Sequence, residues 1–485
     1  MSTELSGGTA GPDALRPLLE LVLAGLRAGA ERRGGPIPAG SPALIAEQTA
    51  AALGITEDED ALLRLTEFLA YGSADPADPA CAAHLHCPPL AVAVAADLAV
   101  SALNPSQDSW DQAPAATALE TALLAELAEL VGFQRGRAAG VLTSGGTESN
   151  LMGLMLARDQ ILGGTVELDG LPAGRRPRIF ASRAAHFSVQ RAAALLGLGE
   201  NAVRAVPVDR ELRMDAGQLA AALAEAVRAG ETPIAVVATA GTTDTGAVDP
   251  LHEAAELAAR YGAWLHVDAA YGGGALLSDR LAPLLDGIGR ADSVSLDWHK
   301  LGWQPVAAGV FLVRQAQTYA SLARRAVYLN PADDEQAGYP SLLGLSLRTT
   351  RRADAFKIAV TLRTLGRAGL GRLVDSCHEL ALGAAEVVRA DPALELHCEP
   401  ILTTVVFRYL PASGDPAEAD RINAELRRVL LREGRAVVGR TELPGEGPGR
   451  VRLKLTLLNP HATAAEVAAV PAAVVRAARS LSDGT

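Results

Sequence analysis

The stretch Trp264-Leu-His-Val-Asp-Ala-Ala-Tyr271 indicates the fold of this 485-residue chain, because a mostly apolar run leads directly to an acidic residue, Asp268. A buried strand that ends at a polar site has this pattern. About thirty residues later, a second apolar run leads to Asp297-Trp-His-Lys300. Far upstream, a third run leads to the glycine-rich Thr143-Ser-Gly-Gly-Thr-Glu-Ser-Asn150. Each of these three motifs therefore follows a predicted strand.

Short apolar segments alternate with helical segments across the middle of the chain, which predicts an α/β fold with a largely parallel, seven-stranded sheet and helices on both faces. Ligands of such sheets bind beyond the carboxyl ends of the strands, where the three motifs fall. The predicted strands are Ala139–Thr143, Arg178–Ser182, Ala202–Val206, Ile234–Thr239, Trp264–Asp268, Ser293–Leu296 and Gly309–Val313.

The pattern differs on either side of this region, so we expect three domains. Residues 1–93 are expected to form an N-terminal helical arm, residues 94–368 the large α/β domain and residues 369–485 a small C-terminal α+β domain. In the arm, apolar residues recur at helical spacing, and a Gly/Pro-rich break falls at Gly34–Pro42. The arm has too little apolar sequence to fold alone, so it should pack on another part of the protein or on a second subunit.

Charge and composition exclude several classes of protein. The net charge of −12 argues against a nucleic-acid partner, and no apolar run is long enough to cross a membrane. The first eleven residues lack a basic region followed by an apolar core, so we expect a cytoplasmic protein. Four cysteines do not suggest a disulfide framework. Cys81, His84, His86 and Cys87 do not have a usual zinc spacing, so no metal site is expected.

The three motifs together supply the groups that pyridoxal 5'-phosphate (PLP) needs. Gly145 and Gly146 would let the backbone approach a phosphate at the N-terminus of the following helix. Asp268 would face a cationic ring nitrogen, and Lys300 would bind the carbonyl carbon of the cofactor. Taken singly, these features are also typical of an ordinary turn, a buried structural acid and a solvated lysine. Their order and spacing favour the cofactor site.

The chain resembles the group II PLP-dependent amino-acid decarboxylases, which have the aspartate-aminotransferase fold (fold type I). This family includes aromatic-amino-acid, glutamate, diaminobutyrate and siderophore-type lysine decarboxylases. The resemblance runs from about residue 80 to 370 and more weakly to the end. It rests on T-S-G-G-T-E-S-N, A-A-H-F-S around His186, A-G-T-T-D-T-G-A-V-D-P, H-V-D-A-A-Y-G-G, A-D-S-V-S-L-D-W-H-K and L-R-T-T-R-R-A-D-A-F-K.

The resemblance implies a carboxy-lyase that acts as a homodimer with shared active sites, and it implies roles for the motif residues. Lys300 would carry the cofactor, Asp268 would pair with its pyridine nitrogen and His186 would stack on its ring. The cofactor contacts would be Gly145, Gly146, Thr147, His186, Thr242 or Thr243, Asp268, Ala270 on the face opposite His186, Ser295 or His299 at the phosphate, and Lys300.

A proton must return to Cα after CO2 leaves, and His186 and Tyr339 are the candidate donors. Tyr339 lies in the Gly/Pro-flanked segment Asn330–Leu342, which we expect to be mobile. The alternative is that Tyr339 is an ordinary surface tyrosine.

The segment Leu103–Glu120 resembles the part of the family that forms the substrate pocket, and it carries an acid at Asp108. A carboxylate there suits a substrate with a distal ammonium. Trp298 also stands where aromatic and glutamate enzymes usually have proline. We therefore expect a small-molecule diamino-acid substrate, L-2,4-diaminobutyrate first and lysine or ornithine next, in contact with His86, Asp108 and Trp110.

Two alternatives remain for this assignment. Asp108 could instead cap a helix. The enzyme could also be an aromatic or acidic amino-acid decarboxylase, or an aldehyde synthase on the same scaffold.

Overall fold

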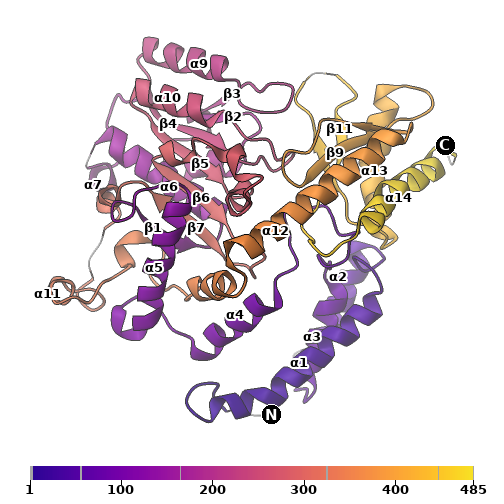
Figure 1. The fold of residues 1–485 in the computed structure, drawn as a ribbon, viewed down its shortest axis with the longest axis horizontal. Coiled ribbons are helices and arrows are strands. Elements are labelled where there is room, and N and C mark those ends of the chain that lie inside the picture. The colour runs from indigo at the N-terminus through magenta and orange to yellow at the C-terminus, as the bar shows by residue number, and fades with distance from the viewer. Residues whose placement is uncertain (1–3, 55–56, 164, 324–325, 446, 484–485) are drawn as a thin grey trace. The chain divides into compact units, whose positions relative to one another are not determined.

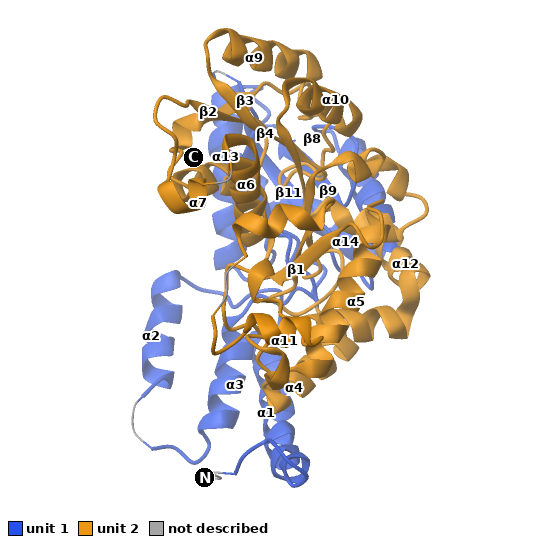
Figure 2. Cartoon of the chain, turned by 90° about the vertical axis from the view of Figure 1, so that its left-hand side faces the viewer, with its two compact units in different colours: residues 1–88, 376–485 blue, residues 89–375 orange. Residues whose placement is uncertain are grey.

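The computed structural model describes residues 4–54, 57–163, 165–323, 326–445 and 447–483. The chain divides into two compact units, Pro89–Asp375 and Met1–Pro88 with Ser376–Thr485 (Figure 2). Unit 2, Pro89–Asp375, contains most of the expected α/β domain. The arm and the C-terminal region, which the sequence suggested as separate domains, fall together in unit 1.

The larger unit contains a seven-stranded sheet in the order β1-β7-β6-β5-β4-β2-β3 (Figure 1). β7 runs opposite to the other six strands of this sheet, so the prediction of a largely parallel seven-stranded sheet of fold type I is confirmed. The strands are β1 (Ala139–Thr143), β2 (Pro177–Ser182), β3 (Val203–Val206), β4 (Thr232–Thr239), β5 (Trp264–Ala269), β6 (Ser293–Asp297) and β7 (Gly309–Val313).

Helices connect these strands, and the buried faces of the helices pack against the sheet to form the hydrophobic core. Leu154, Val189 and Phe311 are among the side chains buried between the sheet and its helices. The helices are α4 (Ala91–Leu103), α5 (Pro114–Leu130), α6 (Gly146–Leu162), α7 (Val166–Asp169), α8 (Ser188–Leu195), α9 (Ala216–Arg228), α10 (Leu251–Tyr261), α11 (Ala332–Gln336) and the first part of α12 (Ala355–Ala390).

Unit 1 contains the arm helices and a four-stranded antiparallel sheet in the order β10-β11-β9-β8. Gly34 to Ser41 separate the first two arm helices, as the Gly/Pro-rich sequence predicted. The elements are α1 (Gly11–Arg33), α2 (Pro42–Ala52), α3 (Ala61–Gly72), β8 (Leu394–Leu396), β9 (Thr404–Tyr409), α13 (Pro416–Arg432), β10 (Gly439–Glu442), β11 (Val451–Thr456) and α14 (Ala464–Asp483).

The arm leaves apolar side chains in solvent. Leu23 on α1 is 58% exposed and Leu69 on α3 is 67% exposed. Over the described residues, no helix is both long enough and apolar enough to span a membrane.

Candidate active site

The three sequence motifs meet at one edge of the larger sheet. β5 and β6 are parallel neighbours, and Asp268 near the end of β5 is paired with Ser295 on β6. β1 and β6 flank the antiparallel β7, so Thr143 and Asp297 end on the same edge. α6 starts from the glycine-rich loop and packs against β4, β5, β6 and β7 (Figure 1).

Lys300 lies beside the glycine-rich loop. Its Nζ is 3.0 Å from Oδ2 of Asp297, whose side chain is only 3% exposed. The other oxygen of Asp297, Oδ1, is buried and accepts no hydrogen bond within the described residues. A Cβ added at Gly146 would stand 3.3 Å from Asp297 Oδ2, so the carboxylate lies directly under this loop. Lysine, carboxylate and loop therefore form one corner of the site.

The loop itself is shaped for close approach. A side chain at Gly146 would come within 2.9 Å of the Ala270 Cβ, and one at Gly145 within 3.2 Å of the His299 ring. α6 begins at Gly146, and Thr147 in its first turn is exposed. The first N–H groups of a helix have no partner inside the helix and favour an anion. This corner can hold the phosphate of the cofactor.

Asp268 accepts hydrogen bonds on both carboxylate oxygens. Oδ2 accepts from Asn150 Nδ2 at 2.7 Å, and Oδ1 accepts from the Ala270 amide at 3.1 Å and from the Ser295 hydroxyl at 3.2 Å. Only 6% of the residue is exposed. Because Asn150, Ala270 and Ser295 all donate to the carboxylate, it is ionised and suited to face a protonated ring nitrogen.

His186 shares its surroundings with the lysine and both acids. Burial lowers its pKa below 6.5, Asp268 and Asp297 oppose this shift, and Lys300 adds to it. Its Nδ1 is 2.9 Å from the Ser188 hydroxyl, which orients the ring. A neutral, oriented imidazole can lie against a flat cofactor ring.

The structure separates the alternatives left open by the sequence. His299 lies against Gly145 in the loop, whereas the Ser295 hydroxyl points to Asp268 and Asn150. Ser295 is therefore better placed for the ring nitrogen than for the phosphate. Thr242 is buried and bonded within its own loop, to Thr245 and to the Ala247 amide. Thr243 is the exposed threonine of the pair.

Two predicted substrate-side residues come together. The rings of Trp110 and Tyr339 meet edge to face, with their centroids 5.0 Å apart. Asp108 accepts from the Ser106 hydroxyl and, at 3.2 Å, from Thr350 Oγ1. The short helix after Asp108 has Ser109 at its N-cap position, so the structure gives no support for Asp108 as its cap. His86 is exposed and belongs to the other unit, so its contact with substrate stays a prediction.

Three residues of the sequence motifs are functional candidates to which the sequence alone assigned no role. Asn150 stands one helical turn after Gly146, on the face of α6 that covers the sheet. His266 precedes Asp268 by two residues, so the period of a strand places both on one face. Asp297 precedes Lys300 by three residues. The periods of the strand and the helix were the sequence signals that could have identified Asn150 and His266.

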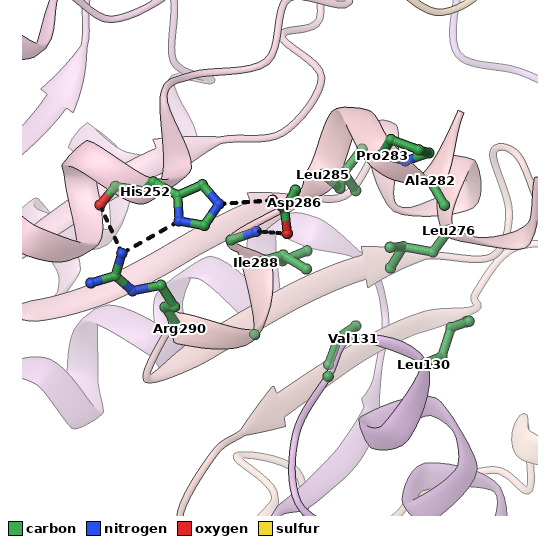
Figure 3. Close-up of a pocket in the computed structure, with 13 residues that line it drawn as sticks. Leu130, Val131, His252, Leu276, Ala282, Pro283, Leu285, Asp286, Ile288 and Arg290 are labelled. Atoms are coloured by element: carbon green, nitrogen blue, oxygen red, sulfur yellow. Dashed lines mark hydrogen bonds and ion pairs between the residues drawn. The ribbon is translucent and has the colours of Figure 1, made fainter. Parts of the chain in front are cut away.

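A separate hollow of about 680 Å³ lies in the same unit (Figure 3). On one side, Arg290 and Asp286 both contact the His252 ring, and on the other the lining is apolar. None of the predicted site residues lines this hollow, and its polar groups bind one another. We assign it no role. Among the described residues, no three His, Cys, Asp or Glu side chains are placed to hold a metal.

These groups fit PLP. The close-approach glycines and a free helix end suit the phosphate, Lys300 suits the carbonyl carbon, and Asp268 suits the ring nitrogen. A fold type I sheet with this site defines a PLP-dependent enzyme. The chain belongs to the family described as the pyridoxal-dependent decarboxylase conserved domain, which matches residues 43–410. The enzyme is thus a PLP-dependent carboxy-lyase, as the sequence predicted.

Relatives support this assignment over most of the chain. The L-2,4-diaminobutyrate decarboxylase of Rhizobium meliloti is 45% identical over 403 residues, which cover 83% of this chain and 78% of the relative. That of Acinetobacter baumannii is 38% identical over 439 residues, covering 88% and 85%. The structure of the glutamate decarboxylase domain of diaminobutyrate-pyruvate transaminase and L-2,4-diaminobutyrate decarboxylase from Vibrio parahaemolyticus is 33% identical, with a TM-score of 0.87 and 98% coverage of both chains.

Proposed function

We propose that this decarboxylase acts on a basic diamino acid, with L-2,4-diaminobutyrate as the first candidate and lysine or ornithine as the next. The observation that carries the proposal is that relatives 45% and 38% identical over most of the chain are named for diaminobutyrate. The acid in the predicted pocket segment, Asp108, agrees with a substrate that has a distal ammonium.

Each residue of the site would have a separate role in the reaction. Bound PLP supplies an electron sink for the pair released when the carboxylate leaves as CO2. Asp268 keeps a proton on the ring nitrogen, because an adjacent negative charge favours the protonated ring. His186 would stack on the ring, and the loop at Gly146 would hold the phosphate. Lys300 would hold the carbonyl carbon of the cofactor.

A proton must then reach Cα. The imidazole of His186 and the hydroxyl of Tyr339 are the candidate donors. Tyr339 is 47% exposed, and its ring contact with Trp110 attaches it to the segment that carries Asp108. This ring contact supports a role for Tyr339 at the predicted substrate pocket rather than an ordinary surface position.

The same fold and cofactor site could also serve other substrates and other reactions. An aromatic or acidic amino-acid decarboxylase would share the cofactor site, and so would a decarboxylating aldehyde synthase. Asp108 and Trp298 favour the diamino acid over the first two. Product analysis separates the third, because an aldehyde synthase releases ammonia and peroxide where a decarboxylase releases only amine and CO2.

We also propose that the enzyme is a cytoplasmic homodimer whose partners share their active sites. The exposed leucines of the arm, such as Leu23 and Leu69, support a subunit interface there, because large exposed apolar patches mark contact surfaces. Removing residues 1–75 deletes this surface, so the apolar surface that it covers on the partner subunit should become exposed and cause aggregation. A soluble, active monomer after this deletion would contradict the dimer proposal.

The central test is a substrate panel. Amine and CO2 should be measured for the twenty common amino acids, ornithine and diaminobutyrate, with Lys300→Ala as the inactive control. We expect diaminobutyrate to have the highest kcat/KM. Preference for tyrosine, tryptophan or glutamate would refute the substrate assignment and leave the decarboxylase assignment intact.

A matched variant tests Asp108. Asp108→Asn should lower kcat/KM for diamino acids. The loss should correspond to about one to three kcal/mol of transition-state free energy, the scale of a charge-assisted hydrogen bond, and should be smaller for uncharged amino acids. Thr350→Val is the control, since it removes a neighbour of Asp108 and keeps the charge. An unchanged ranking of substrates in Asp108→Asn would remove this residue from the pocket.

A further inference from the structure

A continuous row of buried hydrogen bonds runs behind Asp268. The Trp264 indole N–H donates to the Ser293 hydroxyl at 2.8 Å, and that hydroxyl lies 2.8 Å from His266 Nδ1. His266 Nε2 lies 2.8 Å from Asn150 Oδ1, and Asn150 Nδ2 donates to Asp268 at 2.7 Å. His266 and Ser293 are fully buried, and Asn150 is 1% exposed.

The two ends of this row fix its direction. An indole N–H can only donate, and an ionised carboxylate can only accept. Asn150 must therefore turn its NH2 group toward Asp268 and its oxygen toward His266. It follows that His266 carries a proton on Nε2. In the neutral Nε2–H form, the Ser293 hydroxyl donates to Nδ1 and every link is satisfied.

The surroundings favour that same form. Burial lowers the pKa of His266 to about 4, although the charge of Asp268 and a hydrogen bond to the Ser293 backbone oppose the shift. α6 passes close over the ring, since a Cβ added at Gly153 would be 2.6 Å from His266 Nδ1. The imidazole is thus neutral and held between a strand and a helix.

His266 also decides where the proton of Ser295 goes. The Ser295 hydroxyl lies 2.9 Å from Asn150 Oδ1 and 3.2 Å from Asp268 Oδ1, but it has one proton for two acceptors. When His266 donates to Asn150 Oδ1, the Ser295 proton can serve Asp268. Without that donor, Asn150 would compete for the Ser295 proton, and Asp268 would lose one of its donors.

We propose that His266 is a positioning residue for the ring-nitrogen carboxylate: by donating from Nε2 to Asn150 it keeps both Asn150 and Ser295 donating to Asp268. Donors on Asp268 make it a weaker base, so the shared proton stays on the pyridine nitrogen and the electron sink keeps its strength. This inference rests on the proposed role of Asp268 and is independent of the substrate.

Two substitutions separate this role from simple packing. His266→Gln places an amide N–H near the position of Nε2 and can still donate to Asn150. His266→Leu fills much of the volume and cannot donate. A residue that only fills space predicts that both variants lose stability and that neither alters the cofactor. A positioning residue predicts that they differ at the ring nitrogen.

The measurement is solid-state ¹⁵N NMR of holoenzyme loaded with PLP that is ¹⁵N-labelled in the ring, without substrate. We expect the shift of a protonated nitrogen in the parent and in His266→Gln, and a displacement toward the neutral nitrogen in His266→Leu. Turnover in His266→Leu should fall roughly tenfold, by analogy with outer-shell partners of metal ligands, and His266→Gln should recover most of it.

An unchanged ¹⁵N shift in a folded His266→Leu holoenzyme would overturn the proposal. Asp268→Asn is measured alongside: if it too leaves the shift unchanged, the role of Asp268 has failed rather than that of His266 alone. If His266→Leu does not fold, His266→Met replaces it. Its flexible side chain fills the space and has no donor for Asn150, so the same displacement is expected; its absence would equally overturn the proposal.

Discussion

The ion pair between Glu120 on α5 and Arg351 offers a sharp test of the packing around the site. The Arg351 Nη1 lies 2.7 Å from Glu120 Oε1, and the two side chains are 2% and 0% exposed. The same Oε1 accepts from the Leu142 amide at the end of β1. The backbone oxygen of Arg351 also accepts from Gln107 in the predicted pocket segment. The pair thus connects the pocket segment to the strand that leads into the glycine-rich loop.

Glu120→Gln keeps the shape of the side chain and removes its charge. A buried charge left without its partner costs about 3–5 kcal/mol. The double variant Glu120→Leu/Arg351→Met replaces the pair by apolar side chains. It should cost only about 1–2 kcal/mol, chiefly because the Leu142 amide loses its acceptor. The single substitution is therefore expected to destabilise the protein more than the double one.

Urea unfolding of the cofactor-free protein, followed by tryptophan emission, measures this difference. All four tryptophans, at positions 110, 264, 298 and 303, lie in the larger unit, so the signal reports on that unit alone. With a slope of about 3 kcal/mol per molar urea, Glu120→Gln should lower the midpoint by roughly 1 M, and the double variant by about half of that. A double variant that is less stable than Glu120→Gln would refute the reasoning.

Three further outcomes are expected. Borohydride treatment of the holoenzyme should attach the cofactor irreversibly to Lys300, and peptide mapping that finds it on another lysine would refute the assignment. Arg348→Met should weaken PLP binding by about 1 kcal/mol or more, a several-fold change in affinity, because the Arg348 guanidinium, 3.0 Å from Glu148, offsets a negative charge in the first turn of α6, where the phosphate would bind. The double variant with Glu148→Gln should restore the affinity, and no rescue would argue against a charge effect. Because the pKa of buried His266 falls from 6.5 to about 4, the unfolded chain takes up protons first, and stability present above pH 6.5 is lost as the pH falls toward about 4. As the pH is lowered from about 7.5 to 4.5, the urea midpoint of His266→Gln should fall less steeply than that of the parent. Equal slopes would show that this histidine does not contribute to the pH dependence.

The strands and the three motifs could be predicted from sequence because their signals are local. An apolar run before Asp268 or Lys300 identifies a strand end, and glycines before a helix identify a phosphate loop. The contacts that depended on packing could not be predicted. The choice between Ser295 and His299 depends on which way each side chain leaves the backbone, and Ser295 faces the sheet side covered by α6.

Contacts between residues far apart in the sequence also could not be predicted. Glu120 and Arg351 are 231 residues apart, and Trp110 and Tyr339 are almost as distant in the sequence. No periodicity links such residues. The grouping of the arm with the C-terminal region is of the same kind, since it depends on contacts between the two ends of the chain. The motifs predicted which residues would carry the chemistry, whereas the hydrogen bonds that join Asn150 to Asp268 and His266 depend on how α6 packs over the strands.

α6 has a consequence for how this enzyme could change its substrate. Its first turn lies at the proposed phosphate corner, and one turn later Asn150 donates to Asp268, so a single helix would serve both the phosphate end and the nitrogen end of the cofactor. The residues proposed to select the substrate, Asp108, Trp110 and Tyr339, lie on other segments of the chain. Substitutions there can accumulate without moving the helix, so the specificity of the enzyme can evolve while its cofactor chemistry is preserved.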